Sequence, residues 1–207
     1  MASGLLNVVG EHMNGLQIAG IANITASKLN GVQVALCNYA TKARGLQIGL
    51  VNYYKEDMKG FQLGLVNANP DTKVQMMVYG GNATPANIGV RFKNQLFYTI
   101  LGVGSMYQGL NNKFSASASY RAGLSLPLYK GLSISGDLGY QHIEAFDNKD
   151  EVIPKRLYAL QARANLEYQF TRKFGIFATG GYGVTRFYNK SSNYDKGAII
   201  EAGIVLF

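Results

Sequence analysis

The feature that most constrains this chain is the stretch Leu157–Phe170, whose residues alternate between apolar and polar side chains. Period-two alternation places the two sets on opposite faces of a β-strand. The strand is longer than the usual strand of a soluble protein, and aromatic residues stand at both ends of its apolar face. This pattern predicts a transmembrane β-barrel strand with its apolar side toward lipid and its polar side toward the lumen. The apolar face comprises Tyr158, Leu160, Ala162, Ala164, Leu166, Tyr168 and Phe170, and the polar face comprises Gln161, Arg163, Asn165, Glu167 and Gln169.

Composition supports a barrel and excludes several other classes. No apolar run approaches the roughly 20 residues that a membrane helix needs, so any spanning must be done by a closed barrel. The formal net charge is +8, but the basic residues are spread through the expected turns, which argues against a nucleic-acid patch. The charges fit contact with anionic lipid phosphates, and solvated loop charges that need no partner are the preferred interpretation. The single cysteine, Cys37, excludes a disulfide framework. Residues Met1–Gly10 lack the features of a signal peptide, so we expect a mature form, a fragment or a cytosolic protein.

The first third of the chain is repetitive. Each copy starts with Gly, an apolar residue, Gln and another apolar residue, and the four copies start 16, 14 and 15 residues apart, at Gly15, Gly31, Gly45 and Gly60. Each copy ends in Asn, at Asn23, Asn38, Asn52 and Asn67, and Val74–Gly80 is interpreted as a decayed fifth copy. A strand of about eight residues plus a turn fits this unit. In a barrel the Gln residues face the lumen, whereas in a parallel β-solenoid they stack as a ladder.

From Gln95 onward the strands lengthen, and short connections alternate with longer polar ones. Tyr129-Lys130 and Thr171–Lys173 are tight turns, whereas Phe146–Lys155 and Asn189–Lys196 are longer. We therefore predict one all-β domain over 1–207, an antiparallel transmembrane β-barrel of roughly 12 to 14 strands, with short periplasmic turns and longer outer loops. Residues 1–94 form its short-strand repeat half and residues 95–207 its long-strand half.

The repeats and the last residue carry a resemblance to a known family. The Gly-Leu-Gln-Ile-Gly-Leu-Val-Asn pattern of residues 45–52, together with the terminal Phe207, resembles the surface-repeat family of outer-membrane proteins. The resemblance implies a bacterial outer-membrane location and makes Phe207 an assembly signal for the outer-membrane assembly machinery. In that family the terminal Phe faces lipid. Glu201 lies six residues before Phe207 and therefore on the same face of the strand, so a lipid-facing Phe207 would place the Glu201 carboxylate in the membrane, which is costly. Either a bulge in the last strand or an inward Glu201 beside an inward Phe207 resolves the conflict.

Charged residues on the polar faces are the candidate functional groups. Such residues either pair across a narrow lumen and block it, which is the preferred interpretation, or line a pore and set its ion preference. The predicted lumen-lining residues are Arg121, Asp137, Gln161, Arg163, Glu167 and Gln169. Arg186 has lipid-facing parity but lies near a loop, where it can reach lipid phosphate.

No enzyme is predicted. His142 and Glu144 share a face at the end of a strand, as a membrane lipid hydrolase would require, but no Ser accompanies them at a distinctive spacing. No catalytic, cofactor-binding or metal-ligating residue is predicted, and His12 lacks partner ligands. The expected function is a non-enzymatic outer-membrane barrel with a passive pore, transport or structural role. A closed barrel presenting loops for binding or adhesion and a soluble or surface β-solenoid are the alternatives, and a lipid hydrolase ranks last.

Overall fold

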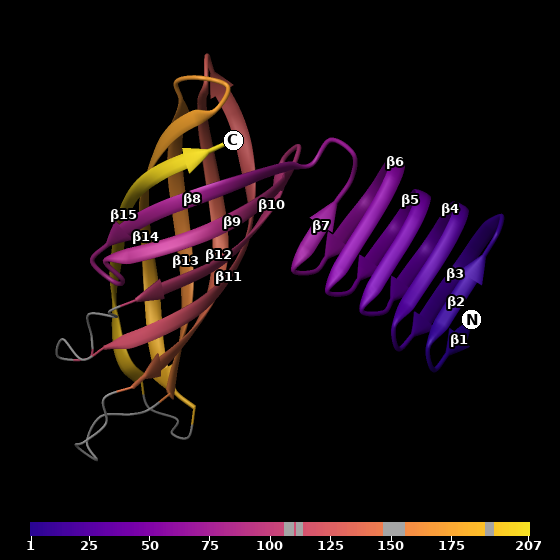
Figure 1. The fold of residues 1–207 in the computed structure, drawn as a ribbon, viewed down its shortest axis with the longest axis horizontal. Coiled ribbons are helices and arrows are strands. Elements are labelled where there is room, and N and C mark those ends of the chain that lie inside the picture. The colour runs from indigo at the N-terminus through magenta and orange to yellow at the C-terminus, as the bar shows by residue number, and fades with distance from the viewer. Residues whose placement is uncertain (106–109, 111–113, 147–155, 189–192) are drawn as a thin grey trace. The chain divides into compact units, whose positions relative to one another are not determined.

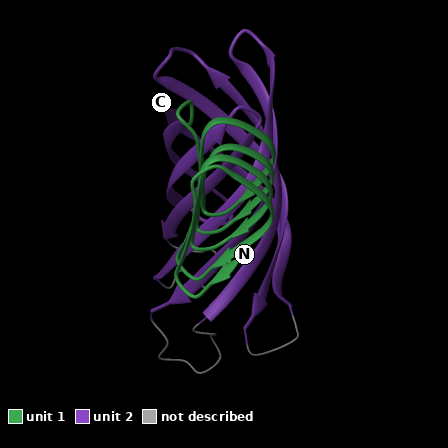
Figure 2. Ribbon diagram, turned by 90° about the vertical axis from the view of Figure 1, so that its right-hand side faces the viewer, with its two compact units in different colours: residues 1–72 green, residues 73–207 purple. Residues whose placement is uncertain are grey.

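The structure is a computed structural model, and it describes residues 1–105, 110, 114–146, 156–188 and 193–207. The described part of the chain divides into two compact units, Met1–Thr72 and Lys73–Phe207, shown in green and purple in Figure 2. This division differs from the prediction of one barrel over 1–207 with halves meeting at residue 94. Among the described residues, no helix is long and apolar enough to cross a membrane.

The first unit is a parallel β-solenoid in which successive coils pair in register (Figure 1). Gly15 pairs with Gly31, Gly31 with Gly45, and Gly45 with Gly60, so each repeat lies on the equivalent residues of the previous one. The strands are β1 (Ala2–Ser3), β2 (Leu6–Val9), β3 (His12–Ala19), β4 (Ala22–Val34), β5 (Cys37–Ile48), β6 (Val51–Leu63) and β7 (Val66–Ala68).

The glycine that opens each repeat is required by the stacking. Gly31 has φ of +150°, and a Cβ added there would lie 1.9 Å from the carbonyl oxygen of Gly15. Gly45 and Gly60 meet the same obstacle from the glycine of the preceding coil. Side chains at these positions would therefore separate the coils, because both the backbone conformation and the space beside it suit only glycine.

Two ladders of amide side chains fill much of the solenoid's interior. Gln33 donates to Gln17 at 2.9 Å, Gln47 to Gln33 at 2.8 Å, and Gln62 to Gln47 at 2.9 Å. The second ladder consists of Asn7, Asn23, Asn38, Asn52 and Asn67, each joined to the next by a side-chain hydrogen bond.

The predicted placement of these Gln residues in a barrel lumen is therefore wrong, and the solenoid alternative describes residues 1–72. Alternation alone predicts a strand without its direction, whereas a repeat of nearly constant length lets identical side chains stack in parallel coils.

The second unit is a closed antiparallel barrel. The described strands of this unit follow one another around the wall in the order β10-β11-β12-β13-β14-β15-β8-β9. Their bounds are β8 (Lys73–Gly81), β9 (Ala86–Asn94), β10 (Phe97–Ser105), β11 (Ser115–Tyr129), β12 (Leu132–Ala145), β13 (Arg156–Gln169), β14 (Phe174–Phe187) and β15 (Asn193–Leu206).

The barrel thus has eight strands among the described residues, and the predicted count of roughly 12 to 14 is wrong. The excess arose because the repeat strands were counted as barrel strands. Val74–Gly80, interpreted as a decayed repeat, instead belongs to β8 and pairs with β9 and β15 in the wall.

The connections at one end of the barrel are short. β9 and β10 are joined across Gln95-Leu96, and β11 and β12 across Lys130-Gly131. Gln95 and Lys130 have φ of 50° and 40°, values that tight turns require and few non-glycine residues adopt. The chain enters the barrel at this end, because Lys73 at the start of β8 pairs with Lys93 beside the β9–β10 turn. The longer connections, at the other end, lie mostly outside the described residues.

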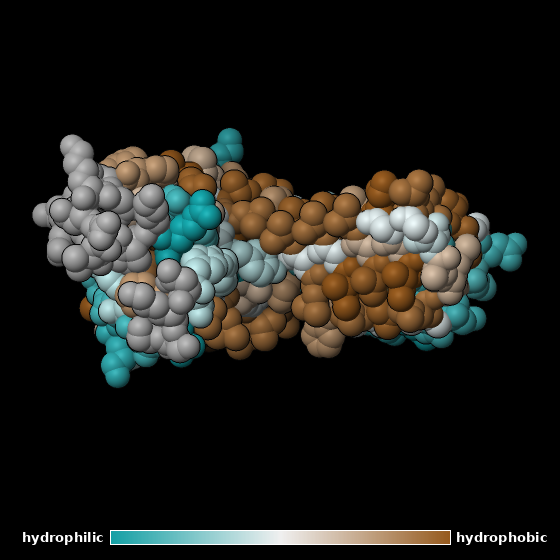
Figure 3. All heavy atoms as spheres, turned by 90° about the horizontal axis from the view of Figure 1, so that it is seen from below, coloured by the Kyte–Doolittle hydropathy of each residue, from teal (hydrophilic) through white to brown (hydrophobic). Residues whose placement is uncertain are grey.

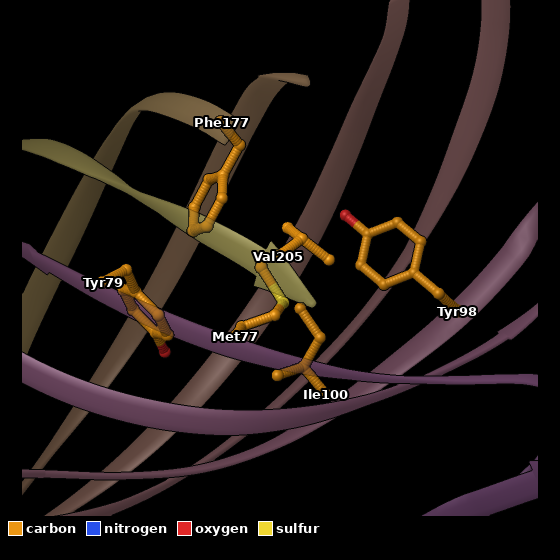
Figure 4. Close-up of a cluster of buried hydrophobic side chains, with 6 residues drawn as sticks. All are labelled: Met77, Tyr79, Tyr98, Ile100, Phe177 and Val205. Carbon is orange, nitrogen blue, oxygen red and sulfur yellow. The ribbon is translucent and has the colours of Figure 1, made fainter. Parts of the chain in front are cut away.

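An apolar cluster occupies the interior toward the short-turn end. It contains residues from four different stretches of the chain, and Figure 4 shows their side chains converging inside the wall: Met77, Tyr79, Tyr98, Ile100, Phe177 and Val205. Tyr98 and Ile100 explain why the β10 region alternates poorly in the sequence, since both faces of that strand are apolar. A second buried cluster, toward the longer connections, contains Leu110, Ile143, Ala145, Leu157 and Ala159.

Candidate functional site: the charged interior of the barrel

Arg121 and Asp137 form a buried ion pair between neighbouring strands. Arg121 Nε donates to Asp137 Oδ1 at 2.8 Å, and Arg121 Nη2 donates to Oδ2 at 2.7 Å. The register places Arg121 opposite Gly139 and Asp137 opposite Gly123, so each charged side chain faces a position without a side chain. A Cβ added at Gly139 would lie 3.1 Å from Cγ of Arg121, which shows that the glycine makes room for the arginine.

A second pair joins strands that are not neighbours. Arg163 on β13 donates from Nε and Nη2 to Glu201 on β15, at 3.1 and 3.2 Å. The intervening strand β14 presents Gly181 and Gly183 toward this region, and a Cβ at Gly181 would lie 3.1 Å from Cγ of Arg163. Arg121 Nη1 lies 3.8 Å from the same Glu201 carboxylate, so the two pairs are connected.

A third pair crosses the interior toward the short-turn end. Arg91 on β9 donates from Nη1 and Nη2 to Glu167 on β13, at 2.6 and 3.0 Å. Its Nε donates to Gln75 Oε1 at 2.6 Å, so the guanidinium is held on three sides. Charge-assisted, two-point contacts of this kind are the strongest ion pairs that proteins form.

Neutral polar groups tie the charged groups together. The Tyr98 hydroxyl and Asn165 Nδ2 both donate to Asp137 Oδ2 at 2.8 Å. Asn165 Oδ1 in turn accepts from Arg121 at 3.1 Å and from Thr179 at 2.7 Å. Asp137 therefore accepts hydrogen bonds from three side chains. These bonds offset the cost of burying its carboxylate away from water.

The interior is filled at the level of these pairs. The hollow bounded by Arg91, Arg121, Glu167, Tyr98 and their neighbours has no room for a water-sized sphere. Toward the longer connections, a polar pocket of about 240 Å³ reaches inward as far as Gln161. The described residues therefore leave a shallow entrance at one end and packed side chains beyond it.

The structure places most of the predicted lumen-lining residues inside the barrel. Arg121, Asp137, Arg163 and Glu167 are buried inside the barrel as parts of the three pairs, and Gln161 is buried beside Gln141, to which it donates at 3.0 Å. Gln169 lies at the short-turn end of β13 and is partly exposed.

Sequence reasoning missed Arg91 and Tyr98 as members of the network. It placed Asn165 on the lumen side and left the side of Glu201 open, without assigning either residue to the network. Arg91 carried a usable signal, because Ile88, Val90 and Phe92 alternate with Gly89 and Arg91 within β9. Tyr98 carried none, since an aromatic residue between apolar neighbours does not show that its hydroxyl reaches a carboxylate across the barrel.

The structure resolves the conflict over the last strand without a bulge at its end. Glu201 is buried inside the barrel, and Phe207, six residues on and of the same parity, packs against the interior cluster of Met77 and Val205. Of the two solutions left open, the inward Glu201 beside an inward Phe207 is the one observed. A lipid-facing Phe207, as the family pattern implies, is not.

His142 and Glu144 lie on the outer face of β12, toward the longer connections. His142 Nδ1 lies 2.7 Å from the Tyr188 hydroxyl, and Glu144 pairs with Arg156 at 3.0 Å. Burial and the hydroxyl of Tyr140 raise the pKa of Tyr188 to about 12, so at neutral pH this hydroxyl keeps its proton. The described partners of His142 are thus Tyr188 and Glu144, with no serine nucleophile in contact.

The outer wall is apolar where the interior is polar. Leu138 and Ile200, for example, stand next in sequence to buried Asp137 and Glu201, and both are about two-thirds exposed or more. Fold and interior together define an antiparallel β-barrel with an apolar exterior and an ion-paired interior, which is the arrangement of barrels that span membranes.

Comparisons with solved structures return barrels of outer membranes. The chain is similar to the N-terminal β-barrel domain of OprF from Pseudomonas aeruginosa, with 16% identity, 64% of this chain and 93% of that chain covered, and a TM-score of 0.41. It is similar to Ail of Yersinia pestis with 13% identity, coverage of 66% and 99%, and a TM-score of 0.40. Neisserial surface protein A gives 7% identity, coverage of 64% and 92%, and a TM-score of 0.38. No family model matches the chain, and no curated protein is similar to it in sequence.

Proposed function

We propose that this chain is a non-enzymatic protein of the bacterial outer membrane whose barrel is closed to solutes and serves a structural role. The observation that carries the proposal is the packing of the three arginine–carboxylate pairs, which leaves no space for water beside Arg121 and Glu167. A pore needs a continuous file of water past its charged residues, whereas here Arg91, Arg121 and Arg163 are each paired with a carboxylate.

The apolar exterior supports the membrane location. Strands β11 to β15 are 14 or 15 residues long, enough to cross the hydrocarbon of a bilayer when tilted. Their outward side chains are mainly aliphatic or aromatic, and the strands close into a barrel, so each strand has a neighbour on both sides. The Gly-apolar-Gln repeats support the finer assignment to the surface-repeat family, whereas the inward Phe207 departs from that family's pattern.

The orientation follows the rule for outer-membrane barrels, with short turns in the periplasm and longer connections outside. On the outer side, Arg156 and Arg186 are exposed on the outer wall, where they can meet anionic lipid phosphates. Of the connections proposed to present a binding surface, 147–155 and 189–192 lie outside the described residues. The assembly machinery remains the proposed reader of Phe207.

Planar-bilayer conductance tests the closed barrel. The protein, shown to be folded by its heat-dependent gel migration, should give no steady conductance steps. The triple variant Tyr98→Ala, Arg121→Ala and Asp137→Ala removes the Arg121–Asp137 ion pair and the Tyr98 side chain that donates to it. It should therefore open a path for water and conduct ions. Leu138→Ala, which shortens an outward side chain on the same strand, is the matched control and should stay silent. Ohmic steps in the unmodified protein, with an ion preference that changes in Arg163→Gln, would overturn the proposal in favour of a pore.

A further inference from the structure

The solenoid of residues 1–72 is apolar on the outside of one edge. At this edge each coil turns between its Gln-bearing and Asn-bearing segments, and one large aliphatic side chain per coil points outward. These side chains are at least one-third exposed, and we call them the apolar edge: Leu5, Ile21, Leu36, Leu50 and Leu65. They form a column, since Ile21 N donates to Leu5 O, Leu50 N to Leu36 O, and Val66 N to Leu50 O.

The faces beside this edge are also apolar. Exposed aliphatic and aromatic side chains flank the Gln ladder on the outside, at Leu16, Ile18, Ile48, Phe61 and Leu63, and the Asn ladder at Leu6, Val8 and Val51. Figure 3 shows broad brown areas over the solenoid on the side turned to the viewer. Contiguous apolar surface of this kind is rare on a protein that meets only water, and marks a contact surface.

Apart from Asp71, in the turn after β7, the charged side chains of residues 1–72 lie at the opposite edge of the same coils. There the chain turns through charged residues, with Lys42 and Glu56 paired at 3.1 Å and both half-exposed. We call this the charged edge, and it comprises Glu11, His12, Lys28, Lys42, Arg44, Lys55, Glu56, Asp57 and Lys59. From Gly45 to Tyr54, a full passage around the apolar edge, no residue carries a charge. The solenoid is therefore divided into an apolar side and a water-facing side.

Many backbone groups of the apolar edge are hydrogen-bonded within the protein. The coil-to-coil hydrogen bonds at the edge continue through Ala35, Gly49 and Leu50, whose N–H groups donate to carbonyls of neighbouring coils. From inside, the ladder asparagines donate to carbonyls next to the edge: Asn7 to Ile18 at 2.8 Å, Asn23 to Val34 at 3.0 Å, and Asn38 to Ile48 at 2.7 Å. Hydrocarbon excludes backbone with unpaired polar groups, and these hydrogen bonds lower the cost of placing this edge there.

The tether to the barrel is short. Only residues 69–72 separate β7 from β8, and even fully extended they span about 14 Å. They are folded into a turn in which Thr72 N donates to Asn69 O at 3.1 Å. β8 starts at the short-turn end of the barrel wall, which is the boundary of the bilayer if the barrel spans it. A linker of this length is too short to carry the solenoid far from that boundary.

We propose that the apolar edge inserts into the acyl-chain region of the bilayer leaflet at the short-turn end of the barrel. Its occupant is phospholipid hydrocarbon, and the charged edge stays in water. The inference rests on the barrel spanning the membrane, but it concerns a surface outside the barrel.

Cys37 allows a direct test, because it is the one cysteine of the sequence, is exposed, and directly follows Leu36 of the apolar edge. The full-length protein is folded into phosphatidylcholine vesicles with a bimane label on Cys37. Fluorescence quenching is measured with brominated acyl chains in the lipid and with iodide in the water. Two variants in a Cys37→Ala background carry the same label: Leu138→Cys on the outer wall of the barrel and Lys55→Cys on the charged edge.

If the proposal is correct, brominated lipid should quench the label at Cys37 about as strongly as the label at Leu138→Cys. Iodide should quench the label at Cys37 several-fold less than the label at Lys55→Cys. Iodide quenching at Cys37 equal to that at Lys55→Cys would overturn it. Shielding of Cys37 from both quenchers would also overturn it, because protein, such as a second copy of the chain, would then cover the edge. Leu138→Cys reports separately on the barrel, so failure of the membrane-spanning proposal is distinguishable.

Charge placed on the edge provides a second test. Leu36→Glu with Leu50→Glu alters two exposed side chains and leaves both ladders intact, so the solenoid should still fold. Iodide quenching at Cys37 should rise several-fold in this variant, whereas Asn30→Glu, an exposed change away from the apolar edge, should leave it unchanged. An unchanged value in the double variant would contradict insertion of this edge.

Discussion

Arg163 and Glu201 are 38 residues apart in the chain and lie on strands separated by β14, yet their side chains meet inside the barrel with Arg163 Nε 3.1 Å from Glu201 Oε2. The contact is possible because β14 carries glycine at position 181, where an added Cβ would lie 3.1 Å from Cγ of Arg163. The pair is therefore built by three strands together, two that supply charge and one that supplies space.

Removing one member of this pair should be costly. Glu201→Ala leaves the Arg163 guanidinium buried without its carboxylate, and breaking a buried pair in this way lowers the free energy of unfolding by about 3 to 5 kcal/mol. Urea titration of the protein in lipid vesicles, followed by tyrosine fluorescence, measures the loss. The double variant Arg163→Met with Glu201→Leu removes both charges and should recover most of the stability. Equal losses in the single and double variants would contradict a pairwise interaction.

The Tyr98 hydroxyl should contribute through its hydrogen bond to Asp137. Tyr98→Phe keeps the ring in the apolar cluster and removes the donor, which lies 2.8 Å from Oδ2. We expect a loss of about 1 to 3 kcal/mol in the same titration, because hydrogen bonds to buried charged groups are worth about that much. Tyr182→Phe, on the exposed outer face of β14, is the control and should change stability little.

The glycine stack should be specific to the solenoid. Gly31→Ala places a Cβ against Gly15 O and should part the coils, whereas Gly10→Ala meets no atom within 4 Å. Limited proteolysis should therefore cut residues 1–72 faster in Gly31→Ala than in Gly10→Ala. Heat-dependent gel migration of the barrel should be the same in both. Loss of barrel migration in Gly31→Ala would show that the two units do not fold independently.

The barrel strands were predictable because successive residues of a barrel strand point alternately to lipid and to the interior, so apolar and polar residues alternate in the sequence. In β13 every residue from Leu157 to Glu167 faces the side that alternation predicts, and Arg163 and Glu167 were found as interior groups for that reason. The pairs themselves were not predictable, since Arg91 and Glu167 are brought together only by closure of the wall.

The solenoid was harder to predict because short strands of period two look alike in parallel and antiparallel sheets. The repeat spacing at Gly15, Gly31, Gly45 and Gly60 was the decisive signal, and it favoured stacking of identical side chains. A barrel has no need of glycine at a fixed place in each strand, whereas coils that lie directly on one another do. The clean alternation after Gln95 favours an antiparallel barrel for residues 95–207, and it carries no information about the direction of the strands before it.

Phe207 combines two properties that can be separated by experiment. It packs partly buried against the interior cluster, so Phe207→Ala should cost less than the roughly 3 to 5 kcal/mol of a fully buried Phe. If the residue is also read by the assembly machinery, the variant should insert slowly into vesicles that contain the machinery and fold at near-normal rate in detergent without it. Phe177→Ala, in the same cluster but inside β14, is the control and should reduce stability without a machinery-dependent delay. Equal effects of Phe207→Ala in both conditions would mean that its contribution is packing alone.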